Sequence, residues 1–383
     1  MARPAATPRV LDDLVRRACA EATGIPVGQM PDAPPRRSAH PPGEYTSALP
    51  ARLAARVRRD GRGLAADAAA ALRRHPHVAD ARADGPGLVA LTPAPGVRAA
   101  LAPAVADAPA RYLLDVPPGQ EPPRAEPPGG WALSELARAD GAARLRDLAR
   151  ADARRRLALA AAPATAADVA ALLAVPSTAD WRDVPPGDPA GEAARLLASI
   201  GEAAARVAAC RSAADQVRPG ETTGPGLPAR PTPEQPGQWA RATHANPAFV
   251  LRYAHAHART AGERWAAGLG LRRAAPDRTL TAEEVAALTA PAAEALLGAL
   301  FDGPAALRAA ARRNQPHILV RYLEGLAAAY HEWWESHDLL SGHADTAHGP
   351  VATTVAGLDL CAAVAGVLHA GLSLIGVSAP TRL

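Results

Sequence analysis

The stretch WARATHANPAFVLRYAHAHART, residues 239–260, decides the fold of the second half of the chain. In it Asn246 precedes Pro247, the order expected where a helix begins. An Asn side chain accepts an orphan backbone N–H, and Pro suits the first helical position. From Trp239 onward the pattern is helical nearly throughout, with breaks expected at 268–276, Pro291, Gly303–Pro304, Pro316 and 341–350.

One face of this predicted helix carries side chains suited to RNA. Phe249, Arg252 and Tyr253 lie three and four residues apart, so they share a face, and His257 follows a further turn along. An aromatic face with an adjacent guanidinium can stack an unpaired base and hold its phosphate. Tyr253 could equally be a core residue, and the Asn246–Pro247 pair could be a purely structural helix start.

The composition favours a mainly α-helical protein of two or three domains. The chain has 383 residues, of which 48% are hydrophobic but only 3% are aromatic. Alanine is abundant, and small side chains at this density suit closely packed helices better than an aromatic-rich sandwich. We therefore expect a mainly α fold.

All 42 basic residues are Arg, and the sequence contains no Lys. Mechanisms that need a lysine, such as Schiff-base chemistry or a Walker A phosphate loop, are thereby excluded. The formal net charge is +4 and the sequence pI is near 9.3. This surplus of guanidinium groups permits nucleic-acid binding without requiring it.

Cysteines and hydropathy indicate a cytoplasmic protein without a membrane span. Cys19, Cys210 and Cys361 form no CxxC pair, so neither a disulfide framework nor a zinc ribbon is implied. Asp12 and Asp13 stand where a secretory segment would need an apolar run. The longest apolar stretch, 351–379, is interrupted by charged and polar residues, namely Asp359 and His369.

The first 105 residues predict a small α+β domain. Residues 1–24 have the periodicity of an amphipathic helix that stops at Gly24. Residues 46–76 predict two helices separated by a turn at Asp60–Gly61, and residues 77–93 alternate as two strands around 85–87.

Between this domain and the helical second half lies a region of mixed character. We expect a Pro-rich hinge and a reduced helical segment over 106–190, with no regular element at 109–130 and helices over 131–173. A helical domain over 191–383 follows, with a short helix at 201–212 and a flexible loop at 218–237. The arginines of 138–156 alternate with aspartates, which favours ion pairs within a helix.

The stretch 239–260 resembles the start of the all-helical anticodon-binding domain of arginyl-tRNA synthetases. Further landmarks of that family follow in the same order, at Gln315–His317, Arg321–Leu323, Ala327–His331 and in the final GVSAPTRL of 376–383. The chain departs from the family at Arg252, commonly Gln, and at His257, commonly Arg, so the base preference of the site is open. The resemblance implies a DALR-type helical anticodon-binding bundle over 191–383.

Two further segments resemble the same synthetases. GEYTSALPARLA (43–54) and GPGLVAL (85–91) resemble their N-terminal extra domain, which in the family meets the elbow of the tRNA. GEAAARVAACRSAADQ (201–216) is similar to the segment that directly follows the catalytic domain. Only about 100 residues separate Leu101 from Gly201, and no His-x-Gly-His motif occurs, so a nucleotide-binding catalytic domain would not fit.

The resemblance implies a protein, not an enzyme, that binds tRNA, an arginine tRNA in particular, without a cofactor or metal. Full-length arginyl-tRNA synthetase is a possible partner. Two alternatives stay open: arginine–tRNA ligase activity, alone or with a catalytic partner, and a protein-interaction scaffold derived from the bundle. The anticodon-binding candidates are Asn246, Phe249, Arg252, Tyr253, His257, Arg321, Trp333, Trp334 and Arg382.

Candidates for contact with the tRNA elbow are Tyr45 and the arginine stripe, defined as Arg52, Arg56 and Arg59 on one predicted helix. A solvated helix face is the alternative for the stripe. Trp333 and Trp334 cannot point the same way on a helix, so we expect one in the core and the other half exposed. His331, His337, His343 and His348 with neighbouring Glu332 and Glu335 fit no HExxH helix, and we expect no metal there.

Overall fold

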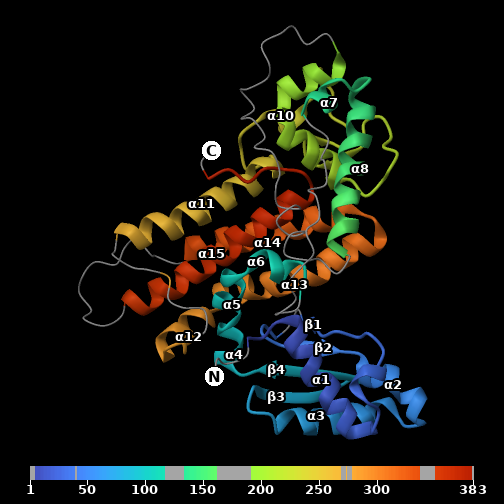
Figure 1. The fold of residues 1–383 in the computed structure, drawn as a ribbon, viewed down its shortest axis with the longest axis vertical. Coiled ribbons are helices and arrows are strands. Elements are labelled where there is room, and N and C mark those ends of the chain that lie inside the picture. Colours follow the sequence, from blue (N-terminus) through green and yellow to red (C-terminus); the bar gives the residue numbers. More distant parts are fainter. Residues whose placement is uncertain are drawn as a thin grey trace. The chain divides into compact units, whose positions relative to one another are not determined.

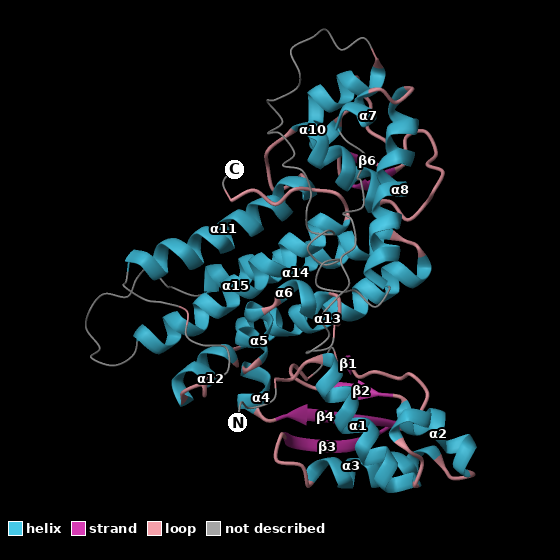
Figure 2. Ribbon diagram, in the orientation of Figure 1, coloured by secondary structure: helices cyan, strands magenta, loops and turns pink. Residues whose placement is uncertain are grey.

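A computed structural model describes residues 5–38, 41–116, 133–161, 191–268, 273, 278–336 and 350–381 (Figure 1). It divides into two compact units. The first unit comprises Met1–Asp107, Leu269–Asp302 and Glu332–Leu360, and the second comprises Ala108–Gly268, Gly303–His331 and Cys361–Leu383. The fold is mainly α-helical with one small N-terminal α+β region, as the sequence predicts (Figure 2).

The first unit opens with three helices at the predicted places. Helix α1 (Pro8–Thr23) begins where the Thr7 hydroxyl accepts from the Val10 amide, and ends at Gly24 with φ 73°. Helices α2 (Leu49–Val57) and α3 (Gly61–Arg73) are separated by Asp60, whose carboxylate accepts from the Gly63 amide at 2.8 Å. Helix caps of this kind satisfy backbone donors that would otherwise have no partner.

A four-stranded antiparallel sheet completes the N-terminal region (Figure 2). Its strands are β1 (Arg36–Arg37), β2 (Tyr45–Ser47), β3 (Val78–Asp84) and β4 (Leu88–Pro93), in the order β1-β2-β4-β3. The predicted hairpin forms at Gly85–Gly87, where both glycines have positive φ. Helix α3 packs against β3 and β4, and Leu64, Leu72, Val89 and Leu91 are buried in this core.

The remaining elements of the first unit are helical. They include η1 (Val27–Gln29), α4 (Pro95–Ala99), α5 (Leu101–Asp107), α12 (Ala282–Leu288) and the first part of α13 (Pro291–Arg313). The N-terminal region contacts α13 through Tyr45, whose ring lies 4.3 Å from that of Phe301, and through two ion pairs. These pairs are Arg98–Glu294 at 3.3 Å and Arg37–Asp302 at 2.7 Å.

The second unit contains α6 (Pro109–Leu113), α7 (Leu133–Ala137), α8 (Gly141–Ala161), α10 (Glu192–Arg211) and α11 (Pro247–Gly268). Strands β5 (Thr222–Gly224) and β6 (Leu227–Pro228) and the turn η2 (Gly237–Ala240) precede α11. Helix α10 is kinked at Gly201, which has φ 78°. Helices α13, α14 (Pro316–Ser336) and α15 (Pro350–Leu374) each contribute residues to both units.

Three expectations about local structure are wrong. The predicted loop 218–237 contains the β5–β6 hairpin, which Gly226 allows by adopting φ 65°. The predicted irregular stretch from Pro109 begins with helix α6, because Pro is well tolerated in a first helical turn. Helix α13 also runs through Pro304 without a break. A helix-interior Pro costs about 3 kcal/mol, and we ascribe its tolerance to burial of Phe301 and Leu307 on either side.

Other predicted breaks are confirmed, because α13 and α14 begin at Pro291 and Pro316 and α11 ends at Gly268. Most of 269–277 and all of 337–349 lie outside the described residues. In α15, Val355–Leu374 is long and apolar enough to cross a membrane by length and composition, but 78% of that window is buried inside the protein. This burial fits the core helix of a folded domain. Asp359 within it is buried and ion-paired with Arg273 and Arg278.

Candidate nucleic-acid interface

A set of aromatic and histidine rings gathers on α11, α14 and the turn before α11. The ring of Phe249 lies 5.6 Å from that of Tyr253, with 13° between their planes. The ring of Tyr253 in turn lies 5.5 Å from that of His331, with 16° between planes. We call these three near-parallel rings the ladder. The sequence spacing of α11 brings its first two members together, and α14 supplies the third.

Three further rings surround the ladder. His257 Nδ1 lies 2.8 Å from the Tyr330 hydroxyl, and the two rings are 5.8 Å apart. His244 lies 6.1 Å from Tyr253, nearly perpendicular to it. The aromatic cluster is defined as His244, Phe249, Tyr253, His257, Tyr330 and His331.

The cluster is partly open to solvent. Tyr330 is fully buried and His244 is exposed, while the other four rings are half-buried. Burial lowers the pKa of His257 and raises that of Tyr330, so both are neutral at pH 7. Half-buried rings fixed on two helices form a surface on which a flat, uncharged group can stack at little cost in side-chain entropy.

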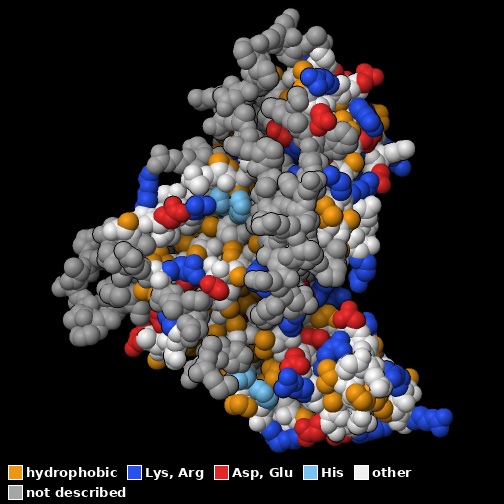
Figure 3. Space-filling model, viewed as in Figure 1, with side chains coloured by type: hydrophobic (Ala, Val, Ile, Leu, Met, Phe, Trp, Pro, Cys, Tyr) orange, Lys and Arg blue, Asp and Glu red, His pale blue; other side chains and the backbone are white. Residues whose placement is uncertain are grey.

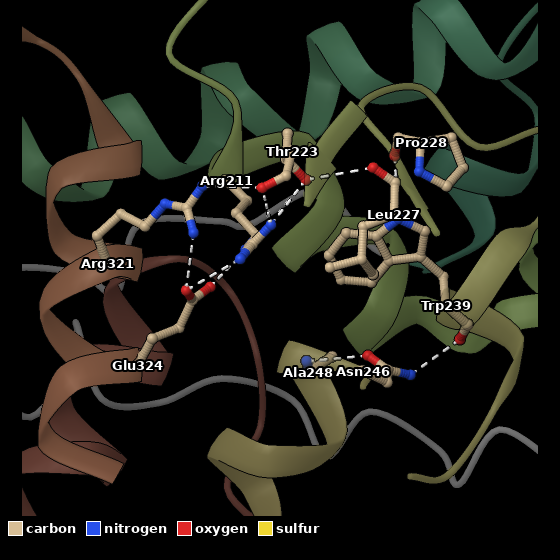
Figure 4. Close-up of polar contacts among 9 residues, drawn as sticks. All are labelled: Arg211, Thr223, Leu227, Pro228, Trp239, Asn246, Ala248, Arg321 and Glu324. Carbon is tan, nitrogen blue, oxygen red and sulfur yellow. Dashed lines mark hydrogen bonds and ion pairs between the residues drawn. The ribbon is translucent and has the colours of Figure 1, made fainter. Parts of the chain in front are cut away.

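Asn246 is buried and acts as an anchor within the protein (Figure 4). Its Nδ2 donates to the carbonyls of Trp239 at 3.0 Å and Arg241 at 2.9 Å, and its Oδ1 accepts from the Ala248 amide at 3.0 Å. The predicted cap at the start of α11 is therefore confirmed. A side chain committed to three internal hydrogen bonds holds the turn before α11 in place, so its predicted anticodon contact would have to be indirect.

Arg321 lies in a second polar network, on α14 (Figure 4). It pairs with Glu324 at 3.0 Å and donates to the Thr223 carbonyl at 3.1 Å. Arg211, the last residue of α10, donates to the same carboxylate and the same carbonyl, each at 2.6 Å. The two arginines thus fasten the β5–β6 hairpin to α14, and Arg321 keeps nearly half of its side chain exposed.

Besides Asn246 and Arg321, three anticodon candidates among the described residues lie outside the cluster, namely Arg252, Trp333 and Trp334. Arg252 is buried, with 8% of its surface exposed, so it does not share the open face with Phe249 and Tyr253. Trp333 is a core residue with 1% exposed, whereas Trp334 is half-buried, which confirms that one faces the core. Burial leaves Arg252 and Trp333 little surface for a base. Arg382 lies outside the described residues.

The elbow candidates also differ in burial. Tyr45 is 2% exposed and stacked on Phe301, so burial removes it from contact with RNA, and the expectation for Tyr45 needs correction. Each arginine of the stripe is exposed but donates to a backbone carbonyl of 22–32. The pairs are Arg52 to Asp32 at 2.6 Å, Arg56 to Gln29 at 2.7 Å and Arg59 to Ala22 at 3.1 Å.

The arginines of α8 are more deeply buried than the predicted pairing implies. Asp152 is fully buried and pairs within the helix with Arg155 and Arg156, as expected. It also pairs with Arg206 of α10 at 2.8 Å, which the sequence did not predict. Arg150 and Arg154 pair with Asp215 beyond α10, and their hydrogen bonds, Arg150 first, lower the pKa of that carboxyl.

Charge and metal-binding groups are dispersed. The face in Figure 3 shows acidic and basic side chains interspersed over the N-terminal region, with no uniform basic field. Among the described residues no group of three or more His, Cys, Asp or Glu could hold a metal, while His337, His343 and His348 lie outside them.

The three cysteines are free and buried, and burial raises the pKa of Cys19 and Cys361 to about 12 and of Cys210 to about 11.

Sequence reasoning omitted three members of the cluster: His244, Tyr330 and His331. The adjacency of Tyr330 and His331 on a predicted helix was visible, but their distance from α11 along the chain hid the contact. His244 offered no signal, because it lies in a turn rather than on a periodic face.

Comparison with known proteins locates the relationship in the C-terminal third of the chain. The DALR anticodon binding domain family matches residues 253–383. The arginine–tRNA ligase of Frankia alni is 42% identical over 143 residues, which are 37% of this chain and 24% of that protein. That of Nitrosospira multiformis is 35% identical over 138 residues, 36% of this chain and 21% of that protein.

The matched part of this chain therefore covers less than a quarter of the length of either relative. Among solved structures, the arginyl-tRNA synthetase of Thermus thermophilus aligns over 98% of this chain and 100% of that chain, with 15% identity and a TM-score of 0.46. A putative arginyl-tRNA synthetase of Campylobacter jejuni aligns over 50% of this chain and 35% of that chain, with 18% identity and a TM-score of 0.35.

Proposed function

We propose, from the premise that residues 253–383 form a DALR anticodon-binding domain, that this protein binds the anticodon stem-loop of a tRNA, an arginine tRNA in particular, without aminoacylating it. The observation that carries the proposal is the aromatic cluster on α11 and α14. Single-stranded RNA is recognised through unstacked bases that stack on aromatic side chains. The cluster offers such rings, half-buried and fixed in orientation.

The energetics support a base as the occupant. Stacking one base on an aromatic ring contributes about 1–3 kcal/mol. The cluster has uncharged rings at its centre, and Arg321 lies on the same helix as His331 with half of its side chain exposed. A guanidinium of this kind can contact a phosphate even while it is bonded to a carbonyl.

The non-catalytic part of the proposal rests on the middle of the chain. Only about 100 residues separate the N-terminal domain from Gly201, and the described ones among them form the helices α5 to α8 and the start of α10. A nucleotide-binding doubly wound domain needs a larger parallel sheet. We place the protein in the cytoplasm, where tRNA is charged, and include full-length arginyl-tRNA synthetase as a possible partner.

Filter binding to total tRNA and to arginine tRNAs with altered anticodons tests the proposal. We expect tight binding to arginine tRNA, loss on anticodon substitution, and at least a tenfold loss for Tyr253→Ala. Tyr112→Ala, which removes a half-buried tyrosine from α6, is the matched control. Equal affinity for unrelated RNA would contradict the proposal. Salt-insensitive copurification of a protein with no RNA would favour an interaction scaffold instead.

A second candidate function is arginine–tRNA ligase activity, alone or with a catalytic partner. The names of the relatives of the C-terminal third favour it. Arginine-dependent ATP–pyrophosphate exchange by the purified chain decides between the two. Exchange above a protein-free blank would establish activation of arginine and end the non-catalytic proposal.

A further inference from the structure

We propose that His244 is a base-contacting residue of the aromatic cluster, whose imidazole hydrogen-bonds the edge of a nucleobase stacked on the ladder. This inference rests on the proposed function, since it assumes an RNA ligand. His244 lies outside the matched residues 253–383 and before the helix start at Asn246–Pro247, so neither the family match nor the helical spacing assigns it a role.

The orientation of His244 is the first argument. Its ring plane stands at 90° to that of Phe249, 82° to that of Tyr253 and 83° to that of His331. The three centroid distances are nearly equal, at 6.3, 6.1 and 6.3 Å. The His244 plane therefore runs along the stacking direction of the ladder. The similar distances place the ring beside Tyr253, the middle ring of the ladder, so one edge of the imidazole points along the ladder toward a base stacked on its end.

A base stacked on these rings presents its polar edge sideways. Its plane would be parallel to the ladder, as in offset aromatic stacks generally, so its donors and acceptors lie around its rim. His244 stands beside the ladder rather than at its end. One edge of the imidazole therefore faces the rim of such a base, whereas the ladder faces its plane.

His244 is also the exposed histidine of the cluster. His257 is bonded to Tyr330 through Nδ1, and His331 makes further contacts in addition to its stack on Tyr253. Within the described part of the chain, neither ring nitrogen of His244 makes a hydrogen bond, and the side chain is exposed. Imidazole nitrogens can hydrogen-bond the mixed edge of a nucleobase.

The backbone of His244 is held at both ends, so little ordering remains to be done on binding. The Asn246 amide closes a turn by donating to the Thr243 carbonyl at 2.9 Å. The Asn246 side chain fixes the carbonyls of Trp239 and Arg241, and the buried Trp239 indole donates to the Pro228 carbonyl at 3.0 Å (Figure 4). Preorganisation of this kind lowers the entropic cost of contacts made by the exposed ring.

The test measures binding of the full chain to synthetic arginine-tRNA anticodon stem-loops by fluorescence anisotropy. His244→Ala removes the ring, and His244→Phe keeps a ring but removes the polar atoms. We expect about tenfold weaker binding for the first and about threefold weaker binding for the second, the range expected for one net hydrogen bond plus a ring contact. His77→Ala, which removes a ring contact with His75 in the N-terminal domain, is the matched control and should bind like the wild type.

A stem-loop series sharpens the assignment. Each loop base is replaced in turn by an analogue that keeps the ring but lacks exocyclic groups. One replacement should weaken wild-type binding about threefold and leave His244→Phe unchanged, the non-additivity expected of a direct contact. The inference is overturned if both variants bind within twofold of wild type, or if every analogue weakens wild type and His244→Phe equally. Wild-type protein that does not prefer these stem-loops over an unrelated hairpin overturns the proposed function itself, and the inference with it.

Discussion

Helices α2 and α8 carry the same sequence pattern, arginines at helical spacing, yet the arginines of α2 are exposed whereas several arginines of α8 are buried. On α2 and just beyond its end, the arginine stripe is exposed and donates to backbone carbonyls of one neighbouring segment. On α8 the side chains of Arg150 and Arg156 are only 2% exposed. The comparison teaches that the spacing of arginines predicts their shared face but not their burial.

The difference has a physical cause in what faces each helix. Helix α8 packs on α10, and Asp152 and Asp215 give its guanidinium groups carboxylate partners. Arg150 also donates to the carbonyls of Ala209 and Ser212 at the end of α10. A buried charge is tolerated only when it is paired and hydrogen-bonded. Arg52 and Arg56 of α2 have carbonyl acceptors but no carboxylate within reach in the described chain, and they stay in solvent.

The largest expected effect is that of Asp152→Ala. It would leave Arg156 buried without its carboxylate and Arg206 with Glu202 alone, and breaking a buried pair costs about 3–5 kcal/mol. Thermal unfolding followed by circular dichroism should therefore show a lower midpoint. Asp67→Ala, which removes the exposed partner of Arg59, is the control and should cost less than about 1 kcal/mol. Equal midpoints for the two variants would break the contrast between α8 and α2.

Much of the fold follows from local sequence, for identifiable reasons. The stop at Gly24, the turn at Asp60–Gly61, the hairpin at 85–87 and the cap at Asn246 act within a few residues, so the sequence alone predicted these element ends. The continuation of α13 through Pro304 depends on burial on both sides of the proline. The β5–β6 hairpin is held by Arg211, which donates to the Thr223 carbonyl. Such long-range compensation is not visible in a local pattern.

A second test concerns pH and a buried histidine of α11. His255 Nδ1 donates to the Pro380 carbonyl at 2.9 Å, and burial lowers its pKa to about 4. In the unfolded chain the pKa returns to about 6.5. Between these values the unfolded state binds more protons, so stability falls as pH decreases through this window. The loss attributable to His255 should be about 2 kcal/mol at pH 5 relative to pH 7.5.

Urea unfolding of wild type and of His255→Asn at the two pH values isolates this contribution. Asparagine keeps a donor for the Pro380 carbonyl but does not titrate near neutral pH. The variant should therefore have a flatter dependence of unfolding free energy on pH. Burial also lowers the pKa of His257 and His369, so part of the slope should remain. An unchanged slope would show that His255 accepts a proton in the folded protein.

Asn246→Ala should have a smaller effect on stability and a visible effect on binding. Loss of the cap and of two further hydrogen bonds costs about 1–2 kcal/mol. Because the same side chain holds the turn that carries His244, affinity for the anticodon stem-loop should fall as well. Thr232→Ala removes the side chain that accepts from the Gln235 amide in an exposed turn, and should change neither quantity. Wild-type affinity in a destabilised Asn246→Ala protein would show that the Asn246 side chain stabilises the fold but does not contribute to RNA binding.

The candidate site was predictable only in part. Phe249, Tyr253 and His257 follow from helical spacing within α11, and the structure brings all three into the cluster. The prediction that Arg252 shares the open face is wrong, because a residue one position from Tyr253 points to a different side of the helix, which is buried here. The prediction that Tyr45 contacts the tRNA elbow is wrong, because its ring packs against Phe301, more than two hundred residues away in sequence. Periodicity predicts which side chains share a face, but not which face is covered.

The smallest expected effect belongs to the arginine stripe and would decide what the exposed arginines of α2 do. Arg56→Ala removes a side chain bonded to the Gln29 carbonyl in solvent, so unfolding should change by less than about 0.5 kcal/mol. If the stripe contacts tRNA phosphates, the variant should bind full-length tRNA more weakly whatever its anticodon, and the slope of log affinity against log salt should fall by about 0.9. Arg17→Ala, which removes an exposed arginine from α1, should leave the slope unchanged. An unaltered slope for Arg56→Ala, with binding to isolated stem-loops also intact, would mean that the stripe is a solvated face and that recognition resides in the helical domain alone.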